Sequence, residues 1–166
     1  MNTVRLRVRR KGDIVRMESK TCCVTGHREI DPRREEQISR MLRDEIEQAV
    51  ADGFTHFISG FATGADLIFA EAVIALKSKY PITLEAALPY PGRMQSRDPQ
   101  FRRCLAACDV VKVHADTYFK GCYMIRNRYM VDRSDRVIAV YDGVSRGGTY
   151  NTVRYAEGKD VRFVWC

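Results

Sequence analysis

The chain has 166 residues, of which 45% are hydrophobic and 30% are charged, and its formal net charge is +7. This length allows one complete hydrophobic core and is short for two domains. No apolar run approaches the roughly 20 residues that span a bilayer, and no apolar segment follows the basic N-terminus as it would in a secretory signal. We therefore expect one globular, cytoplasmic domain with no membrane partner.

The positive charge is concentrated at the N-terminus. Residues 1–20 contain seven Lys or Arg against two acidic residues, whereas residues 21–166 contain 21 basic and 19 acidic residues. Because binding to a phosphate backbone needs clustered basic groups, the balanced charge of residues 21–166 argues against a nucleic-acid partner. The sequence predicts a basic extension over residues 1–20 and a single domain over residues 21–166. The alternation in residues 4–9 and the turn at residues 11–13 fit a β-hairpin in the extension, and a disordered basic tail is an equal alternative.

The cysteines predict neither a disulfide framework nor a metal site. Cys22 and Cys23 are adjacent in an apolar stretch, so their side chains point to opposite faces of a strand. Cys104 and Cys108 are four residues apart, which places them on one helix face and is not a Cys-x-x-Cys zinc spacing. We expect free thiols in a reducing compartment and no bound metal.

From residue 21 onward, the predicted elements alternate between strand and helix. Strands are expected over residues 21–25, 55–59, 82–88, 110–113, 136–141 and 161–165, and helices over residues 31–52, 64–75, 101–107, 122–134 and 148–157. The first helix has a clear signature, because Asp31-Pro32 fits an N-cap and N1 pair and Ile38, Leu42 and Ile46 follow on one face. The alternation implies a mainly parallel sheet with helices on both faces. The right-handed crossover rule then predicts a Rossmann-like, doubly wound α/β fold.

Three loops that contain glycine follow predicted strands, at the sheet edge where doubly wound folds bind their ligands. They are Thr25-Gly26-His27-Arg28, Ser59-Gly60-Phe61-Ala62-Thr63-Gly64-Ala65-Asp66 and Ser145-Arg146-Gly147-Gly148-Thr149. Glycine lets backbone amides approach an anion, and the N-terminus of the following helix adds free N–H groups and a favourable dipole. Each loop taken alone also fits an ordinary strand-to-helix turn. Together they predict a phosphate-bearing, nucleotide-like ligand.

The candidate ligand-binding residues come from these loops and from one helix. Arg28 has the geometry for a bidentate contact to phosphate, and Asp66 fits either a local helix cap or an acceptor for a ribose hydroxyl. Arg126 and Arg128 lie on a helix that should return to the same sheet edge. The full set is Gly26, His27, Arg28, Gly60, Thr63, Gly64, Asp66, Arg126, Arg128, Gly147, Gly148 and Thr149.

As an ordered set, these motifs resemble the SLOG superfamily, the Rossmann-like group that joins DNA-processing protein A to the Lonely Guy phosphoribohydrolases. The resemblance covers residues 21–166 and is strongest to the YpsA-related proteins. It rests on the first two loops, on Leu88-Pro89-Tyr90, on Arg126-Asn127-Arg128 with the residues up to Asp135, and on Gly147-Gly148-Thr149-x-x-Thr152. It implies a pocket for a nucleotide or a nucleotide derivative such as ADP-ribose or NAD, with Arg126 and Arg128 near the phosphate or the catalytic position. It also leaves a homodimer open, because helices of this superfamily often pair.

One departure from the superfamily bears on catalysis. The Lonely Guy enzymes carry a glutamate at the place of Asn151, and an amide cannot act as the carboxylate that assists N-glycosidic cleavage. The leading hypothesis is therefore a nucleotide-binding sensor or regulatory protein. A second is a phosphoribohydrolase-like enzyme in which Asp66, Glu71, Asp132 or Asp142 replaces the glutamate. The third is single-stranded nucleic-acid binding, prompted by the basic extension and by DNA-processing protein A.

Overall fold

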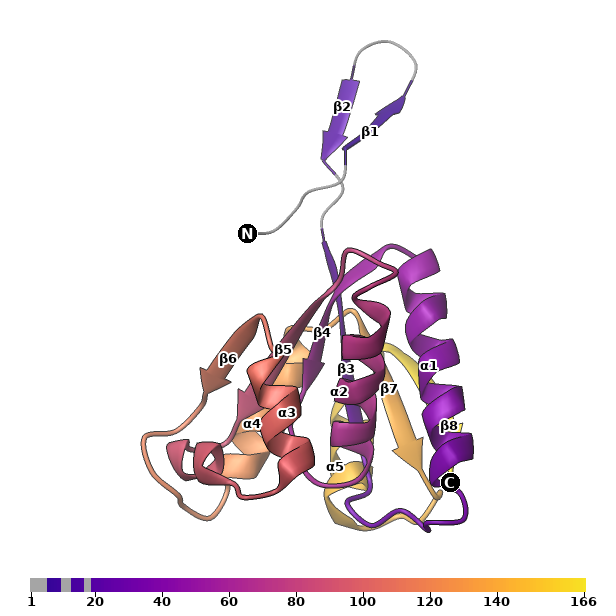
Figure 1. The fold of residues 1–166 in the computed structure, drawn as a ribbon. Coiled ribbons are helices and arrows are strands. Elements are labelled where there is room, and N and C mark those ends of the chain that lie inside the picture. Colours follow the sequence, from indigo (N-terminus) through magenta and orange to yellow (C-terminus); the bar gives the residue numbers. More distant parts are fainter. Residues whose placement is uncertain (1–5, 10–12, 17–18) are drawn as a thin grey trace.

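The computed structural model describes residues 6–9, 13–16 and 19–166 (Figure 1). Strands β1 (Leu6–Arg9) and β2 (Asp13–Arg16) pair in antiparallel fashion. The turn expected at residues 11–13 lies largely outside the described residues. The division into an extension and one domain stays a prediction.

The main sheet confirms the predicted fold class. Its six strands are β3 (Lys20–Gly26), β4 (Phe54–Ser59), β5 (Thr83–Leu88), β6 (Val110–Val113), β7 (Arg136–Tyr141) and β8 (Asp160–Trp165). They pair in the order β6-β5-β4-β3-β7-β8, and every pairing is parallel. The chain runs outward from β3 to β6 and then returns to the other side of β3 at β7. The topological switch point therefore lies between β3 and β7.

Helices cover both faces of this sheet (Figure 1). They are α1 (Glu35–Ala51), α2 (Ala65–Leu76), η1 (Pro91–Gln95, a 3₁₀ turn), α3 (Pro99–Ala106), α4 (Cys122–Asp132) and α5 (Gly147–Tyr155). Alternate strand residues face opposite sides, so Val24 packs in the core with α1, α2 and α3, whereas Cys23 packs with Met130 of α4. In the described part of the chain, no helix is both long and apolar enough to cross a membrane.

Helix α1 begins later than its sequence signature suggests. The Asp31 carboxylate accepts a hydrogen bond from the backbone N–H of Arg33 and also pairs with its guanidinium at 2.8 Å. The backbone N–H of Arg34 donates to the Asp31 carbonyl, which closes a turn before the helix. Arg34 occupies the N-cap position, and the helix starts at Glu35. The expected cap at Asp31 was wrong because this side chain stabilises the preceding turn instead.

All six cysteines are free thiols, as the spacing indicated. Burial raises the pKa of Cys23 to about 12, with the nearby Asp66 adding to the rise. Burial likewise raises the pKa of Cys22 above its ordinary value. These two thiols stay protonated at neutral pH and pack as small apolar side chains.

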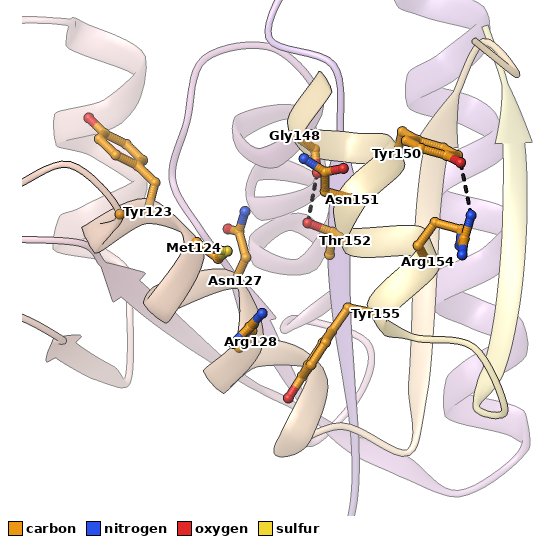
Figure 2. A pocket seen from close by; sticks show the side chains of 11 residues that line it. Tyr123, Met124, Asn127, Arg128, Gly148, Tyr150, Asn151, Thr152, Arg154 and Tyr155 are labelled. Atoms are coloured by element: carbon orange, nitrogen blue, oxygen red, sulfur yellow. Dashed lines mark hydrogen bonds between the residues drawn. The ribbon is translucent and has the colours of Figure 1, made fainter. Parts of the chain in front are cut away.

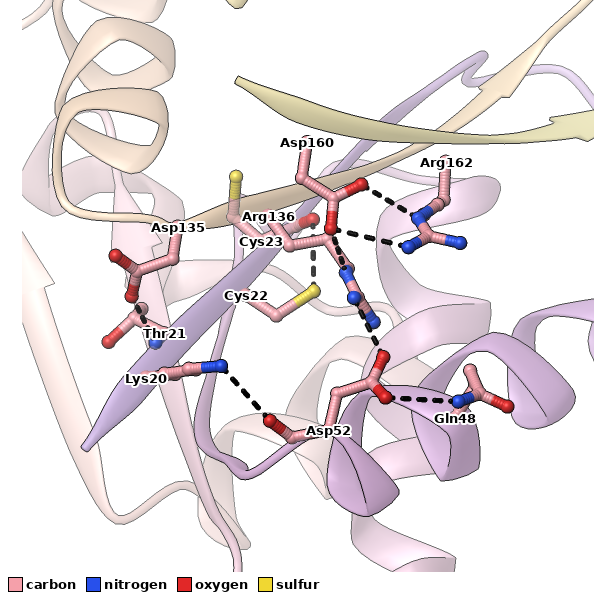
Figure 3. A network of polar contacts seen from close by, with 10 residues as sticks. All are labelled: Lys20, Thr21, Cys22, Cys23, Gln48, Asp52, Asp135, Arg136, Asp160 and Arg162. Atoms are coloured by element: carbon pink, nitrogen blue, oxygen red, sulfur yellow. Dashed lines mark hydrogen bonds and ion pairs between the residues drawn. The ribbon is translucent and has the colours of Figure 1, made fainter. Parts of the chain in front are cut away.

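A buried arginine joins the starts of β7 and β8 to the end of α1 (Figure 3). The Arg136 side chain is 5% exposed; its Nη2 lies 2.8 Å from Asp52 Oδ2 and its Nε 2.7 Å from Asp160 Oδ2. The same guanidinium lies over the Phe54 ring at 4.6 Å. A planar fork is needed to reach both carboxylates at once.

We expect Arg136→Lys to lower the free energy of unfolding by about 2 kcal/mol, because lysine keeps the charge but cannot bridge two carboxylates while stacking on a ring. Arg162→Lys is the matched control, since the Arg162 side chain is 43% exposed and, within the described part of the chain, pairs only with Asp160. It should change stability by no more than about 0.5 kcal/mol. Urea unfolding of the two variants checks this, and equal losses would contradict a special role for the buried guanidinium.

Candidate functional site

The carboxyl ends of β3, β4 and β7 meet beside the N-terminus of α5, at the switch point. A cavity of about 270 Å³ opens there, and we call it the cradle. Its walls come from the first two glycine loops, from α4 and from the start of α5. The lining residues are Val24, Thr25, Gly26, His27, Arg28, Ala62, Asp66, Asn127, Met130, Gly148 and Thr149. The fold thus brings six of the twelve predicted site residues into one cavity.

Two glycines hold the first and second loops together. A Cβ on Gly26 would lie 2.4 Å from Ala65 Cβ and 2.8 Å from Val140 Cβ, so only glycine lets α2 and β7 approach the end of β3 this closely. Gly64 has φ +79° and sits against the carbonyls of His27 and Arg28. The backbone N–H of Ala65 donates to the His27 carbonyl at 3.1 Å. The role of Gly26 and Gly64 is therefore to shape the cradle.

The N-terminus of α5 forms the open wall of the cradle. Gly147 adopts φ +89°, and apart from the chain neighbours and the helix's own backbone, no atom of the described residues lies within 4 Å of a Cβ built on Gly147 or Gly148. Thr149 is buried and lines the cavity. The first N–H groups of a helix have no partner within the helix, and the helix dipole favours negative charge there. This wall is suited to a phosphate.

The cradle contains one buried carboxylate, Asp66 in the first turn of α2. Its Oδ2 accepts a hydrogen bond from the backbone N–H of Ala62 at 3.2 Å, which fixes the second loop. Burial raises the pKa of Asp66 to about 6, against the opposing effect of Arg126 and Arg28. The side chain is 7% exposed. Asp66 thus stabilises its own loop, and a contact to ribose stays a prediction.

Arg126 crosses from α4 to the carboxyl ends of β4 and β5. Its Nη1 donates to the carbonyls of Gly60 and Ala87, the latter at 3.1 Å, and its Nε donates to Asn127 Oδ1 at 2.8 Å. A Cβ on Gly60 would lie 2.7 Å from both Arg126 Nη1 and Asp66 Oδ2. Gly60 is therefore required for the arginine and the aspartate to approach the same loop.

Arg128 lies elsewhere. Its guanidinium is over the Tyr155 ring at 5.1 Å, in a groove of about 690 Å³ between α4 and α5 (Figure 2). The groove shares Asn127 and Gly148 with the cradle. Its full lining is Gly121, Tyr123, Met124, Asn127, Arg128, Gly148, Tyr150, Asn151, Thr152, Arg154 and Tyr155. Arg126 and Arg128 therefore line different cavities, and a role for either in ligand binding stays a prediction.

His27 is tied to the end of β7. Its Nε2 lies 3.1 Å from Asp142 Oδ1 and 3.2 Å from the backbone nitrogen of Asp142. Its ring stacks on Tyr141 at 5.9 Å. Hydrogen bonding from the backbone N–H of Val144, together with His27, lowers the pKa of Asp142. These contacts keep the imidazole on the rim of the cradle.

A smaller cavity of about 120 Å³ adjoins the cradle and contains the predicted residues Gly60 and Thr63. Its lining also includes Arg93 and Tyr123, which the sequence reasoning missed. Arg93 had a usable signal, because it follows Pro91-Gly92 directly after β5 and so belongs to the same sheet edge. No sequence pattern indicated Tyr123, since its position in the cavity depends on how α4 packs against the sheet.

The fold and the position of its glycine loops place the protein among the Rossmann-like α/β proteins. Within that class, the chain belongs to the YspA SLOG family, whose model matches residues 22–161. It is 35% identical over 138 residues to the uncharacterized SPbeta prophage-derived protein YoqJ of Bacillus subtilis (strain 168). This match covers 70% of the chain and 80% of YoqJ.

Two solved structures share the fold. DNA processing protein A from Helicobacter pylori, in a structure described as showing its single-stranded DNA binding mode, superposes with a TM-score of 0.62 at 20% identity. The match covers 87% of this chain and 64% of that protein, so the chain spans less than two thirds of its length. The structural-genomics target TM1055 superposes with a TM-score of 0.55 at 16% identity, over 86% of this chain and 72% of the target.

Proposed function

We propose that this protein binds a nucleotide-like small molecule in the cytoplasm and that the phosphate of this ligand sits in the cradle. The observation that carries the proposal is the convergence of an open helix N-terminus at Gly148 with Gly26 and Arg28 at the switch point. Backbone amides, a helix dipole and a guanidinium there all favour an anion.

The groove between α4 and α5 supports the nucleotide part of the proposal. It opens directly from the cradle at Asn127 and Gly148, so a phosphate held there leaves the rest of the ligand next to the groove. Tyr123, Tyr150 and Tyr155 line the groove and supply aromatic surface beside which a base can pack. A nucleotide or an ADP-ribose-like molecule fits this combination of one anionic end and one aromatic end.

Hydrolysis is less well supported, because three of the four candidate carboxylates are engaged outside the cradle. Glu71 pairs with Arg103 at 3.6 Å, Asp132 accepts from the Tyr155 hydroxyl at 2.9 Å, and Asp142 accepts from the backbone of Val144. Only Asp66 lines the cavity. If the protein were a phosphoribohydrolase-like enzyme, free base would be released from nucleoside monophosphates and Asp66→Asn would stop the release.

Single-stranded nucleic acid is a second candidate ligand, favoured by the shared fold with DNA processing protein A. Such binding would depend on the basic residues 1–20 and would weaken steeply as salt is raised. Oligonucleotide titrations at two salt concentrations, with and without that segment, separate it from binding of a free nucleotide.

We expect Gly148→Asp to abolish the rise in melting temperature that nucleotides produce. A Cβ at this position meets no described atom within 4 Å beyond its chain neighbours and its own helix backbone, so the variant should fold, while its carboxylate repels a phosphate at the α5 N-terminus. Gly148→Ala is the control and should retain the shift. Thermal unfolding with a panel of adenine nucleotides measures both, and a shift unchanged in Gly148→Asp would refute the placement of the phosphate.

A further inference from the structure

Three arginines converge on the small cavity beside the cradle, which we call the arginine pocket. Arg28, Arg93 and Arg126 line it together with Tyr123, and no carboxylate is among its lining residues. Arg28 and Ala62 line both this pocket and the cradle, so the two cavities are direct neighbours. A ligand in the cradle therefore has the arginine pocket within reach.

The three guanidinium groups lack an acidic partner in the part of the chain that the structure describes. Among the described residues, none of them forms an ion pair within 4.0 Å, whereas Arg136 and Arg162 each do. Asp66 is the acid whose charge acts on Arg126, yet it lies beyond ion-pair distance and faces the cradle. Like charges gathered without counterions repel one another, and a bound anion would remove that repulsion.

Arg126 is a buried member of the arginine pocket. The residue is only 3% exposed, and its Nη1 and Nε donate to carbonyl and amide oxygens. No described residue accepts a hydrogen bond from its Nη2. Burying a charge is costly unless it is paired. A buried guanidinium with free donors at a polar pocket therefore indicates an anionic partner.

Tyr123 holds two of the arginines in place. The Arg28 guanidinium carbon lies 5.0 Å and that of Arg126 5.6 Å from the centre of the Tyr123 ring. Arg93 lies over the Phe101 ring at 5.5 Å. Cation–π contacts restrain these side chains without neutralising them, so the pocket is preorganised and its charge is still available.

We propose that the arginine pocket is a second phosphate subsite, so that the ligand carries two phosphate groups, one on the α5 N-terminus and one among Arg28, Arg93 and Arg126. This inference rests on the proposed function and narrows its ligand to doubly phosphorylated nucleotides, meaning diphosphate-linked or bisphosphate compounds. Arginine forks match phosphate oxygens bidentately, which favours phosphate over a smaller anion.

Isothermal titration at constant ionic strength tests the proposal. The ligands are AMP, ADP, ADP-ribose, adenosine 3′,5′-bisphosphate and inorganic pyrophosphate. We expect at least one doubly phosphorylated nucleotide to bind about tenfold or more tightly than AMP. Arg93→Gln should remove this gain and leave the affinity for AMP within about twofold. Arg102→Gln, which removes an exposed charge from α3, is the matched control and should retain the gain.

The outcomes separate the two proposals. If the doubly phosphorylated ligands lose affinity in Gly148→Asp but not in Arg93→Gln, the proposal of a second phosphate subsite is wrong and the placement of one phosphate in the cradle is supported. The second subsite is also wrong if Arg102→Gln has the same effect as Arg93→Gln, or if AMP binds as tightly as the other nucleotides. If pyrophosphate alone binds and requires Arg93, the pocket stands and the nucleotide ligand is wrong. Binding of none of the five compounds overturns both proposals. Melting temperatures of the free variants within about 2 °C of the wild type confirm that they fold.

Discussion

Replacement of Gly64 by alanine is expected to lower the free energy of unfolding by about 3 kcal/mol or more. Gly64 has φ +79° and ψ −126°, a backbone conformation that side chains rarely adopt. An alanine Cβ would also lie 2.4 Å from the Arg28 carbonyl oxygen and 2.6 Å from that of His27. These are backbone atoms, so they cannot rotate away as a side chain would. Relief of the contact requires the first and second glycine loops to separate.

Gly53→Ala is the matched control for this prediction. Gly53 also has positive φ, at +95°, but beyond its two chain neighbours no atom of the described residues lies within 4 Å of its Cβ position. In Gly53→Ala the free energy of unfolding should fall by only about 1 kcal/mol, which is the cost of placing alanine at positive φ. Urea unfolding of both variants therefore separates backbone conformation from loop contact. Equal losses would show that the approach of Gly64 to the first loop does not contribute to stability.

The fold could be predicted because its signals are local and repeated. Alternating strands and helices imply a parallel sheet, and the glycine at the end of β3 marks a place where backbone must pass closely. The start of α1 could not be placed this way, because Asp31 suits both a helix cap and a turn. The competition between these two local hydrogen-bonding patterns is decided by a few contacts that no periodicity encodes.

The structure divides the predicted site residues among neighbouring cavities, and the cause is geometric. Residues two apart on a helix point to nearly opposite sides, so Arg126 and Arg128 face different cavities. Arg126 enters the sheet edge, whereas Arg128 stacks on Tyr155 in the groove. Arg93 and Tyr123 were missed because the arginine pocket forms only when the loop after β5 meets α4. Contacts of that kind are set by tertiary packing and leave no local pattern.

Asp66→Asn is expected to stabilise the protein at pH 8 by up to about 3 kcal/mol and to have little effect at pH 4. The folded protein raises the pKa of Asp66 from 3.8 to about 6, chiefly through burial. A carboxyl with a raised pKa binds its proton more tightly in the folded state. Its cost to stability is therefore absent below pH 4, grows as pH rises between 4 and 6, and is complete above that. Asparagine removes the charge and keeps an oxygen for the Ala62 N–H.

Urea unfolding at pH 4, 6 and 8 measures this difference between wild type and variant. We expect the difference in free energy of unfolding between variant and wild type to increase with pH. A difference that is the same at all three pH values would mean that packing, and not the charge, causes the effect. Asp66→Glu serves as the control that keeps the carboxylate. Asp66→Asn should therefore be more stable than the wild type at pH 8, and Asp66→Glu should not.

The ionisation of Asp66 should also be coupled to anion binding in the cradle. An anion in the cradle lies near Asp66 and raises its pKa further, so binding should take up protons and weaken as pH rises from 5 to 8. Sulfate is a suitable probe, because its own charge is constant over this range. In Asp66→Asn the pH dependence of sulfate binding should shrink. Proton uptake that is unchanged in Asp66→Asn would remove the aspartate from the cradle's electrostatics. In that case the only role of the Asp66 carboxyl would be to accept the hydrogen bond from the Ala62 N–H, and its ionisation would not make anion binding depend on pH.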